Sequence, residues 1–209
     1  MRSIVIATNN KNKLAEFKRI FSSEQGSAYN ILSLADVGFF DEIEENADTF
    51  HGNALIKAKT VSEYTGLCAV ADDSGLQVDS LCGAPGVYSA RYAGEGASSA
   101  QLIEKLLFEM KDVAKENRTA RFVSVMCAYF PNGESIFAEG VCEGRILTVS
   151  AGDNGFGYDP VFYYKPLGKT FAEMDSVEKN SISHRALATF NLLEKIKGLD
   201  EVAFESSKS

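Results

Sequence analysis

Two adjacent carboxylates, Asp72 and Asp73, follow the apolar run 67–71 and precede Ser74 and a glycine. The run has the small and β-branched composition of a buried strand, so we expect that strand to end at the carboxylates. Ligands of α/β proteins bind at the carboxyl ends of strands, where carboxylates can hold a divalent cation or activate water. The alternative is a plain turn, because Asp, Ser and Gly are also common turn residues.

A polar turn lies between the strand-like segment 4–7 and an amphipathic helix that continues to Phe21; it consists of Thr8, Asn9, Asn10, Lys11, Asn12 and Lys13. Backbone N–H groups at a strand-to-helix junction point outward and carry the positive end of the helix dipole, and the polar side chains of the turn add donors suited to phosphate. The glycine pattern of a Walker loop does not accompany them. The alternative is a capped helix start with solvated lysines.

A second helix is expected from about Asp48 to Tyr64, with Asp48 or Thr49 as its cap. Glu45 lies in an acidic cluster just before this helix, and Lys57 lies within it. Acidic clusters are usually solvated. Glu45 and Lys57 can nevertheless face one site if the helix packs near the strand that carries Asp73.

Two glycine-rich loops occur later in the chain, at 81–94 and 152–160. We expect the first to be ordered and to lie over the site, although a Pro-Gly turn with core-packed tyrosines would have the same composition. The second places glycines around Phe156 and Tyr158. Such a loop can lie flat against a planar ring, but many loops of this kind are purely structural.

A last helix is expected to run through Ile196, with Ser183 as its cap, which places His184 and Arg185 in the first turn. Cations are disfavoured at a helix N-terminus, so an anionic or carbonyl-bearing partner is one explanation of this pair. A lone His-Arg pair is more often a surface feature.

The remaining pattern predicts a mixed α/β fold. A strand is expected within 29–37, a helix from roughly Ser98 to Lys115, and a short strand at 161–164. Two long strands, 118–130 and 134–148, flank Pro131-Asn132-Gly133, which is a strong hairpin signal because Asn-Gly readily supplies positive φ. A hairpin within an otherwise parallel arrangement makes the sheet mixed.

Composition limits the possible functions. A chain of 209 residues, 45% hydrophobic and 24% charged, fits one large domain or two small lobes with a substantial core. The net charge of -8 argues against an extended nucleic-acid or membrane surface, so an anionic ligand needs a local cationic pocket or a metal. The four cysteines form no C-x-x-C pair, and the first residues show neither a long apolar segment nor a cleavage-site pattern. We therefore expect no structural zinc, no secretion and a reducing, cytoplasmic compartment.

Several separated segments, in this order and spacing, together resemble the inosine/xanthosine triphosphate pyrophosphatase family; they are residues 8–13, 71–76, 83–92, 156–160 and 183–185. The resemblance covers nearly the whole chain, from Ile4 to about Lys197. Two positions depart from the family pattern. Asn9 stands where glycine is frequent, and Gly96 stands where an acidic residue often follows the Gly-Glu pair.

The resemblance implies an elongated mixed sheet with flanking helices and two lobes around a central nucleotide-binding cleft. A single pyrophosphatase domain would occupy 1–200, and 201–209 would form a C-terminal tail. The implied activity is Mg²⁺-dependent hydrolysis of ITP, dITP and XTP to the monophosphate and pyrophosphate, which cleanses the nucleotide pool. The implied protein is a cytoplasmic homodimer without nucleic-acid or membrane partners.

By position, the resemblance makes Asp73 the metal ligand and proton acceptor, with Glu45 sharing the metal and Asp72 nearby. Thr8 to Lys13, Lys57 and Ser74 would contact phosphate. The residues around the base would be Phe156, Gly157, Tyr158, Asp159, Lys179, His184 and Arg185. A 6-oxo purine offers an acceptor where adenine offers an amino donor, so the cationic side chains of this set would be left unpaired against ATP.

Two other functions fit part of the pattern. A related pyrophosphatase could act on pyrimidine or modified nucleotides, but the segments 156–159 and 183–185 argue against it. A nucleotide-binding sensor could use the same site without turnover. The intact carboxylates Asp72, Asp73 and Glu45 argue against a sensor.

Overall fold

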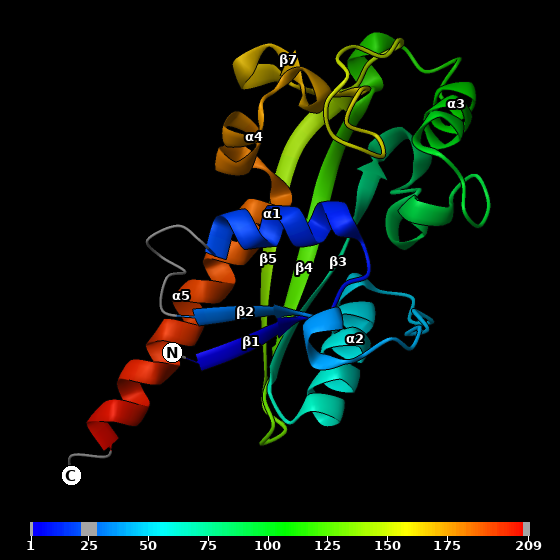
Figure 1. Cartoon of the computed structure of the whole chain (residues 1–209). Helices are drawn as coiled ribbons and strands as arrows, with labels where there is room; N and C mark the ends of the chain where they lie inside the picture. Colours follow the sequence, from blue (N-terminus) through cyan, green and yellow to red (C-terminus); the bar gives the residue numbers. More distant parts are fainter. Residues whose placement is uncertain (1, 22–28, 207–209) are drawn as a thin grey trace. The chain divides into compact units, whose positions relative to one another are not determined.

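The computed structural model describes residues 2–21 and 29–206, with side chains described for 3–21 and 29–199 (Figure 1). Its elements in chain order are β1 (Arg2–Ile6), α1 (Lys11–Phe21), β2 (Tyr29–Ser33), α2 (Phe50–Thr65), β3 (Cys68–Val78), α3 (Ser99–Glu109), β4 (Thr119–Tyr129), β5 (Ser135–Ile146), β6 (Phe162–Tyr164), β7 (Lys169–Thr170), α4 (Ser176–Ile182) and α5 (His184–Ser206). The strands pair in the order β2-β1-β3-β4-β5-β6-β7. β1 is parallel to β2 and β3, whereas β6 is antiparallel to β5 and β7, which confirms the mixed α/β fold.

The chain forms two compact units. Unit 1 contains Met1–Asp73, Ser124–Gly140 and Arg185–Ser209, and unit 2 contains Ser74–Val123 and Val141–His184. The strands β3, β4 and β5 contribute residues to both units. The single domain over 1–200 stays a prediction. Of the expected tail at 201–209, α5 includes the part up to Ser206, and residues 207–209 lie outside the described residues.

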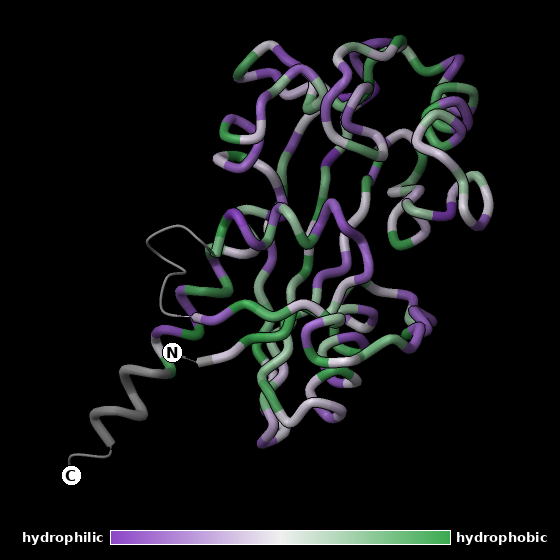
Figure 2. Tube along the Cα trace, viewed as in Figure 1, coloured by the Kyte–Doolittle hydropathy of each residue, from purple (hydrophilic) through white to green (hydrophobic). Residues whose placement is uncertain are grey.

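Helices cover both faces of the strands in unit 1. Alternate residues of a strand point to opposite faces, so each strand contributes apolar side chains to two cores. On one face, α1 and α5 cover a core that includes Ile4, Ile6 and Val70. On the other face, α2 covers a core that includes Ala69 and Ala71. Figure 2 shows hydrophobic residues (green) along these strands and hydrophilic residues (purple) in the segment before α2.

Unit 2 has its own aromatic core. Phe122 of β4 lies with its ring centroid 4.6 Å from that of Phe162, and Phe162 lies 4.8 Å from Phe171. Leu106 and Met110, at the end of α3, pack into the same cluster. Tyr158 also belongs to this cluster, so the core fixes one residue of the glycine-rich loop 152–160.

Two sequence predictions of local structure were wrong, and one short helix was missed. β3 does not end at the carboxylates but continues through them to Val78, because buried cations and an amide, described below, pair with the acidic side chains. α3 ends at Glu109, and the carbonyl of Met110 is capped by the buried side chain of Arg118, 2.7 Å away. α4 was not predicted, although its capping box was visible in the sequence: Asp175 accepts from the N–H of Glu178, whose side chain accepts from the N–H of Asp175.

The described residues contain no disulfide between the cysteines. All four cysteines are free thiols; burial raises the pKa of Cys127 and of Cys142 to about 12, while Cys82 is exposed. Among the described residues, no helix has both the length and the apolar composition that a membrane crossing requires.

Candidate active site

The neighbouring carboxylates of β3 point to opposite faces of unit 1. Asp72 lies on the face of Val70, which α1 and α5 cover, and Asp73 lies on the face of Ala71, which α2 covers. Both side chains are buried, with exposed fractions of 1% for Asp72 and 6% for Asp73. The two carboxylates therefore contact different sets of residues.

Asp72 is the centre of a buried ion-pair network. Its Oδ2 lies 3.0 Å from Lys13 Nζ of α1 and 3.2 Å from Arg185 Nε of α5. A second carboxylate, Glu16, pairs with the Nη1 atom of Arg185. Burial alone would raise the pKa of Asp72, but the two cations hold it well below its usual range. Burial also lowers the pKa of Lys13, and Asp72 opposes that shift.

Asp73 lies among polar side chains of α2 and the segment before it. Asn53 Nδ2 donates to Asp73 Oδ2 at 3.0 Å, and Lys57 Nζ lies 4.0 Å from Asp73 Oδ1. The same ammonium donates to Glu45 Oε2 at 2.8 Å. Burial raises the pKa of Asp73, against the lowering effects of Lys57 and Asn53. The structure thus brings Glu45, Lys57 and Asp73 together, as the sequence predicted for a helix packed beside this strand.

The carboxylate oxygens at and beside Asp73 are suitable ligands for a small hard cation. Glu45 and Asp73 supply oxygen ligands, and the ammonium of Lys57 already places positive charge against both carboxylates. In the described part of the chain, no three His, Cys, Asp or Glu side chains gather as a ready metal cage. Mg²⁺ needs no such cage, because it is commonly held by one or two carboxylates together with substrate phosphates and water. Asp72 as a third ligand stays a prediction.

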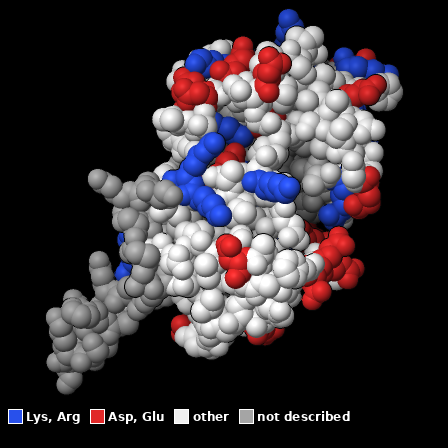
Figure 3. Space-filling view, viewed as in Figure 1, with Lys and Arg blue, Asp and Glu red and all other residues white. Residues whose placement is uncertain are grey.

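The start of α1 is a capped helix terminus with basic neighbours. Asn10 Oδ1 accepts from the N–H groups of Asn12 at 3.0 Å and Lys13 at 3.2 Å, and Thr8 Oγ1 accepts from the N–H of Asn10 at 3.2 Å. Figure 3 shows lysine and arginine side chains (blue) gathered over α1 on this face. Asn9 and Lys11 are exposed. The side chain of Asn10 therefore already uses two of the amides that we expected to face phosphate.

Unit 2 holds a second polar cluster around Asp159. Asp159 Oδ2 accepts from the N–H of Phe156 at 2.8 Å and from Lys179 Nζ at 2.8 Å. The Lys179 ammonium also lies over the Phe156 ring, 5.0 Å from its centroid. Asp159 and Lys179 are both buried. Asp159 therefore fixes the positions of both an aromatic face and a cation.

Tyr158 and Gly157 anchor the loop 152–160 to other parts of unit 2. The Tyr158 hydroxyl donates to the carbonyl of Ser89 at 2.9 Å, and the N–H of Gly157 donates to Ser99 Oγ at 2.9 Å. His184 stacks on Phe122, with centroids 4.7 Å apart and an interplanar angle of 11°. The predicted base residues of unit 2 thus divide into Phe156, Asp159 and Lys179, which form one cluster, and residues held against the core.

The family model described as Ham1 family matches residues 4–195. A dITP/XTP pyrophosphatase of Shouchella clausii is 48% identical over 199 residues, covering 95% of this chain and 98% of the relative. This chain belongs to the Ham1 family. A dITP/XTP pyrophosphatase of Bacillus subtilis is also 48% identical, over 186 residues, covering 89% of this chain and 92% of the relative.

Solved structures agree with membership of the Ham1 family. The Ham1 protein of Staphylococcus aureus gives a TM-score of 0.84 at 38% identity, covering 94% of this chain and 99% of that chain. A nucleoside-triphosphatase and dITP/XTP pyrophosphatase of Mycobacterium abscessus gives a TM-score of 0.73 at 42% identity, covering 91% of this chain and 98% of that chain. These likenesses confirm the family resemblance and the fold class that the sequence predicted.

Sequence reasoning missed two polar residues of this Ham1 site. Asn53 lies four residues before Lys57, so the two share a face of α2, and a second polar residue among the small and apolar residues of that face was the available signal. Glu16 completes the Asp72 network, but an acidic residue on an amphipathic helix gives no such signal. Arg185, predicted beside the base, makes its described ion pairs with Asp72 and Glu16 in unit 1.

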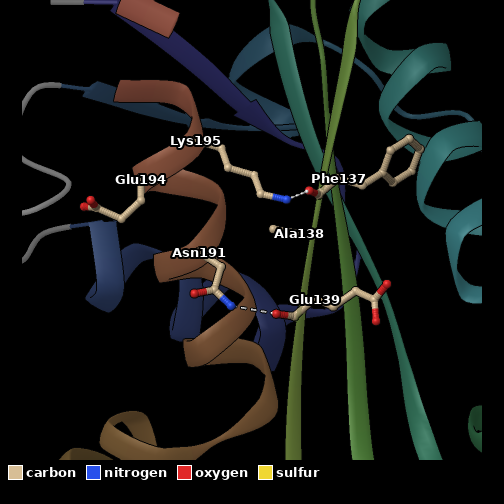
Figure 4. Close-up of a pocket in the computed structure, with 6 residues that line it drawn as sticks. All are labelled: Phe137, Ala138, Glu139, Asn191, Glu194 and Lys195. Carbon is tan, nitrogen blue, oxygen red and sulfur yellow. Dashed lines mark hydrogen bonds between the residues drawn. The ribbon is translucent and has the colours of Figure 1, made fainter. Parts of the chain in front are cut away.

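A separate hollow of about 580 Å³ in unit 1 of this Ham1 protein contains none of the predicted site residues; it is lined by Phe137, Ala138, Glu139, Asn191, Glu194 and Lys195. Figure 4 shows Lys195 and Asn191 of α5 reaching to β5, where they donate to the carbonyls of Phe137 at 2.6 Å and Glu139 at 2.8 Å. Side chains that occupy edge carbonyls hinder pairing by another strand. Because β6 pairs with β5 at Arg145 and Ile146, residues 137–139 lie beyond that pairing, and the hollow lies along an edge of β5 that α5 covers.

Gly155 gives a first testable prediction. Its φ is +78°, and a Cβ there would lie 2.1 Å from Asp159 Oδ2. We expect Gly155→Ala to displace the Asp159 carboxylate and lower kcat/KM for XTP by about 10-fold or more. Small displacements of groups that position a substrate reduce the reaction rate strongly. Gly96→Ala is the matched control, since Gly96 also has a positive φ, +70°, but open space around it. Steady-state kinetics on both variants check this, and equal losses would show that backbone strain alone is responsible.

Proposed function

We propose that this protein hydrolyses dITP, XTP and ITP to the nucleoside monophosphate and pyrophosphate in a Mg²⁺-dependent reaction. The observation that carries the proposal is the pair of carboxylates, Glu45 and Asp73, that both lie within 4.0 Å of the Lys57 ammonium. Relatives with 48% identity over most of the chain bear the name dITP/XTP pyrophosphatase. A homodimer in the cytoplasm, free of nucleic-acid and membrane partners, is part of the proposal.

Unit 1 would bind the triphosphate. A triphosphate brings about four negative charges to a chain whose net charge is -8, so the local field must be reversed. One opposite charge at about 4 Å contributes roughly 4 kcal/mol at an effective dielectric near 20, before desolvation. Lys13 and Lys57 would supply this charge, and each would exchange a carboxylate contact for a phosphate contact. Thr8, Asn9, Asn10, Lys11, Asn12 and Ser74 stay proposed phosphate contacts.

Asp73 and Glu45 would hold the metal. When bound there, Mg²⁺ supplies Lewis-acid polarisation of phosphate oxygens and neutralises charge. Asp73 would orient the attacking water and accept its proton, which is the task of a general base within hydrogen-bonding reach. Asn53 would hold this carboxylate in one orientation by donating to Oδ2. The attack would break the bond between the α- and β-phosphates, with pyrophosphate as the leaving group.

Unit 2 would select the base. Phe156 offers a stacking face, and the Lys179 ammonium beside it can donate to a 6-oxo group. An adenine amino group offers no acceptor there, and each buried donor left unpaired costs about 1 to 3 kcal/mol. His184, Gly157, Tyr158 and Arg185 remain part of the proposed base-binding set. Rejection of ATP would follow from donors that only an oxo group can satisfy.

Product analysis tests this function. We expect pyrophosphate, and not orthophosphate, to be released from XTP in Mg²⁺ and its release to stop in EDTA. In water labelled with heavy oxygen, the label should enter the monophosphate. Binding of XTP without pyrophosphate release would instead indicate a nucleotide sensor, and release of orthophosphate would contradict the proposed bond cleavage.

A further inference from the structure

We propose that Asn53 is a positioning residue that sets both the orientation of Asp73 and the location of Glu45, a role that rests on the function proposed above. Asn53 is 1% exposed on α2. Its amide nitrogen donates to Asp73 Oδ2 at 3.0 Å, and its amide oxygen accepts from the N–H of Ala47 at 2.9 Å. One side chain therefore links a carboxylate of β3 to the segment that presents Glu45.

The chemistry of the two contacts requires an amide in a single orientation. A backbone N–H needs an acceptor, and a carboxylate needs a donor, so the Asn53 amide cannot be reversed here. An aspartate at position 53 would lose the donor and face Asp73 with a second negative charge. A leucine of similar size would leave the Asp73 oxygen and the Ala47 N–H without this buried partner.

The segment before α2 lies close against the first turn of the helix. A Cβ at Gly52 would lie 2.5 Å from the Ala47 Cβ, so glycine permits this approach. Thr49 accepts from the N–H of Gly52 at 3.1 Å, which caps the helix at the same place. The contact between Asn53 and Ala47 thus fixes the backbone two residues after Glu45.

Lys57 connects the two carboxylates that Asn53 positions. With Asp73 Oδ2 held by Asn53, it is Oδ1 that faces Lys57, at 4.0 Å, while Glu45 lies 2.8 Å from the same ammonium. Asn53 and Lys57 are separated by one helical turn, so the helix sets their spacing. Loss of the Asn53 contacts should let both carboxylates rotate or drift, which weakens any cation held by the pair.

Direct Mn²⁺ binding tests this role without turnover. Mn²⁺ prefers the same oxygen ligands as Mg²⁺ and can be titrated by electron paramagnetic resonance on the nucleotide-free protein. We expect Asn53→Leu to weaken Mn²⁺ binding by about 10- to 100-fold, the usual effect of removing a partner that orients a metal ligand. Amide hydrogen exchange at Ala47 should also accelerate. Asn53→Asp, which keeps the size and an acceptor for Ala47, should leave Ala47 protected, so it separates the Ala47 contact from the Asp73 contact.

Ser62→Ala is the matched control. Ser62 is also 1% exposed on α2, but its hydroxyl donates to the carbonyl of Leu67 at 2.7 Å, and neither residue belongs to the site. This variant should lose stability without a change of more than about twofold in Mn²⁺ affinity. Mn²⁺ affinity of Asn53→Leu within about twofold of wild type would overturn the positioning role, as would a wild-type protein that binds no Mn²⁺. Absence of pyrophosphate release by the wild type would instead refute the proposed function.

Discussion

Asp73→Asn should lower kcat for XTP by about 10²- to 10⁴-fold, the range of contributions of a positioned general base. Asparagine keeps the size of the side chain but cannot accept the proton of the attacking water, and it offers a metal only one oxygen. The protein should stay folded, because the substitution removes a buried charge whose pKa burial already raises. Steady-state pyrophosphate release at saturating XTP and Mg²⁺ gives kcat, and thermal unfolding checks the fold.

Glu63→Gln is the control for Asp73→Asn. Glu63 lies on α2, is exposed, and pairs with Lys59 at 3.8 Å, so its loss should leave kcat unchanged. A turnover rate of Asp73→Asn close to that of wild type would remove Asp73 from the role of base. The carboxylate would then have to act through binding alone.

Asp72→Asn should reduce the free energy of unfolding by about 3 to 5 kcal/mol, the usual result of removing one partner from a buried ion pair. Lys13 and Arg185 would keep their charges beside an amide that cannot neutralise them. Urea unfolding followed by circular dichroism measures the loss. Asp79→Asn is the control, because Asp79 pairs with Arg121 at an exposed position, where a pair contributes about 1 kcal/mol or less.

The same substitution should change the response to acid. The folded-state pKa of Asp72 is depressed below its usual value, so its contribution to stability is complete above the unfolded-state pKa, near 3.8. That contribution is lost as the pH falls from about 4 through the folded pKa. The difference in unfolding free energy between wild type and Asp72→Asn should therefore shrink in acid. A difference that stays constant from neutral pH to pH values of about 3 would show that the ion pair does not carry the effect.

The sequence predicted much of this arrangement because local patterns and packing agree. The apolar run 4–7 located β1, and the Pro131-Asn132-Gly133 turn located the hairpin of β4 and β5. The end of β3 was placed wrongly because consecutive acidic residues normally terminate strands. Here Asp72 and Asp73 stay within the strand, since cations from α1 and α5 and an amide from α2 reach them. Partners that are distant in sequence leave no local signal.

The candidate site likewise contains features that the sequence predicted and one that it could not predict. The grouping of Glu45, Lys57 and Asp73 followed from placing one helix beside one strand, and the structure contains it. Strand geometry also explains why Asp72 and Asp73 point to opposite faces, once the strand is known to continue through them. The role of Asn53 could not be derived in advance, because it depends on the backbone of Ala47 approaching α2.

The most direct test of the proposed function is the ratio of kcat/KM for XTP or dITP to that for ATP, measured by pyrophosphate release in Mg²⁺. Each buried donor that ATP leaves unpaired should contribute roughly 10- to 100-fold, so the ratio should be about 10² or higher. Lys179→Met should lower that ratio by reducing activity on XTP more than activity on ATP. Equal kcat/KM values for XTP, dITP and ATP in the wild-type protein would contradict the proposed selection of 6-oxo purines.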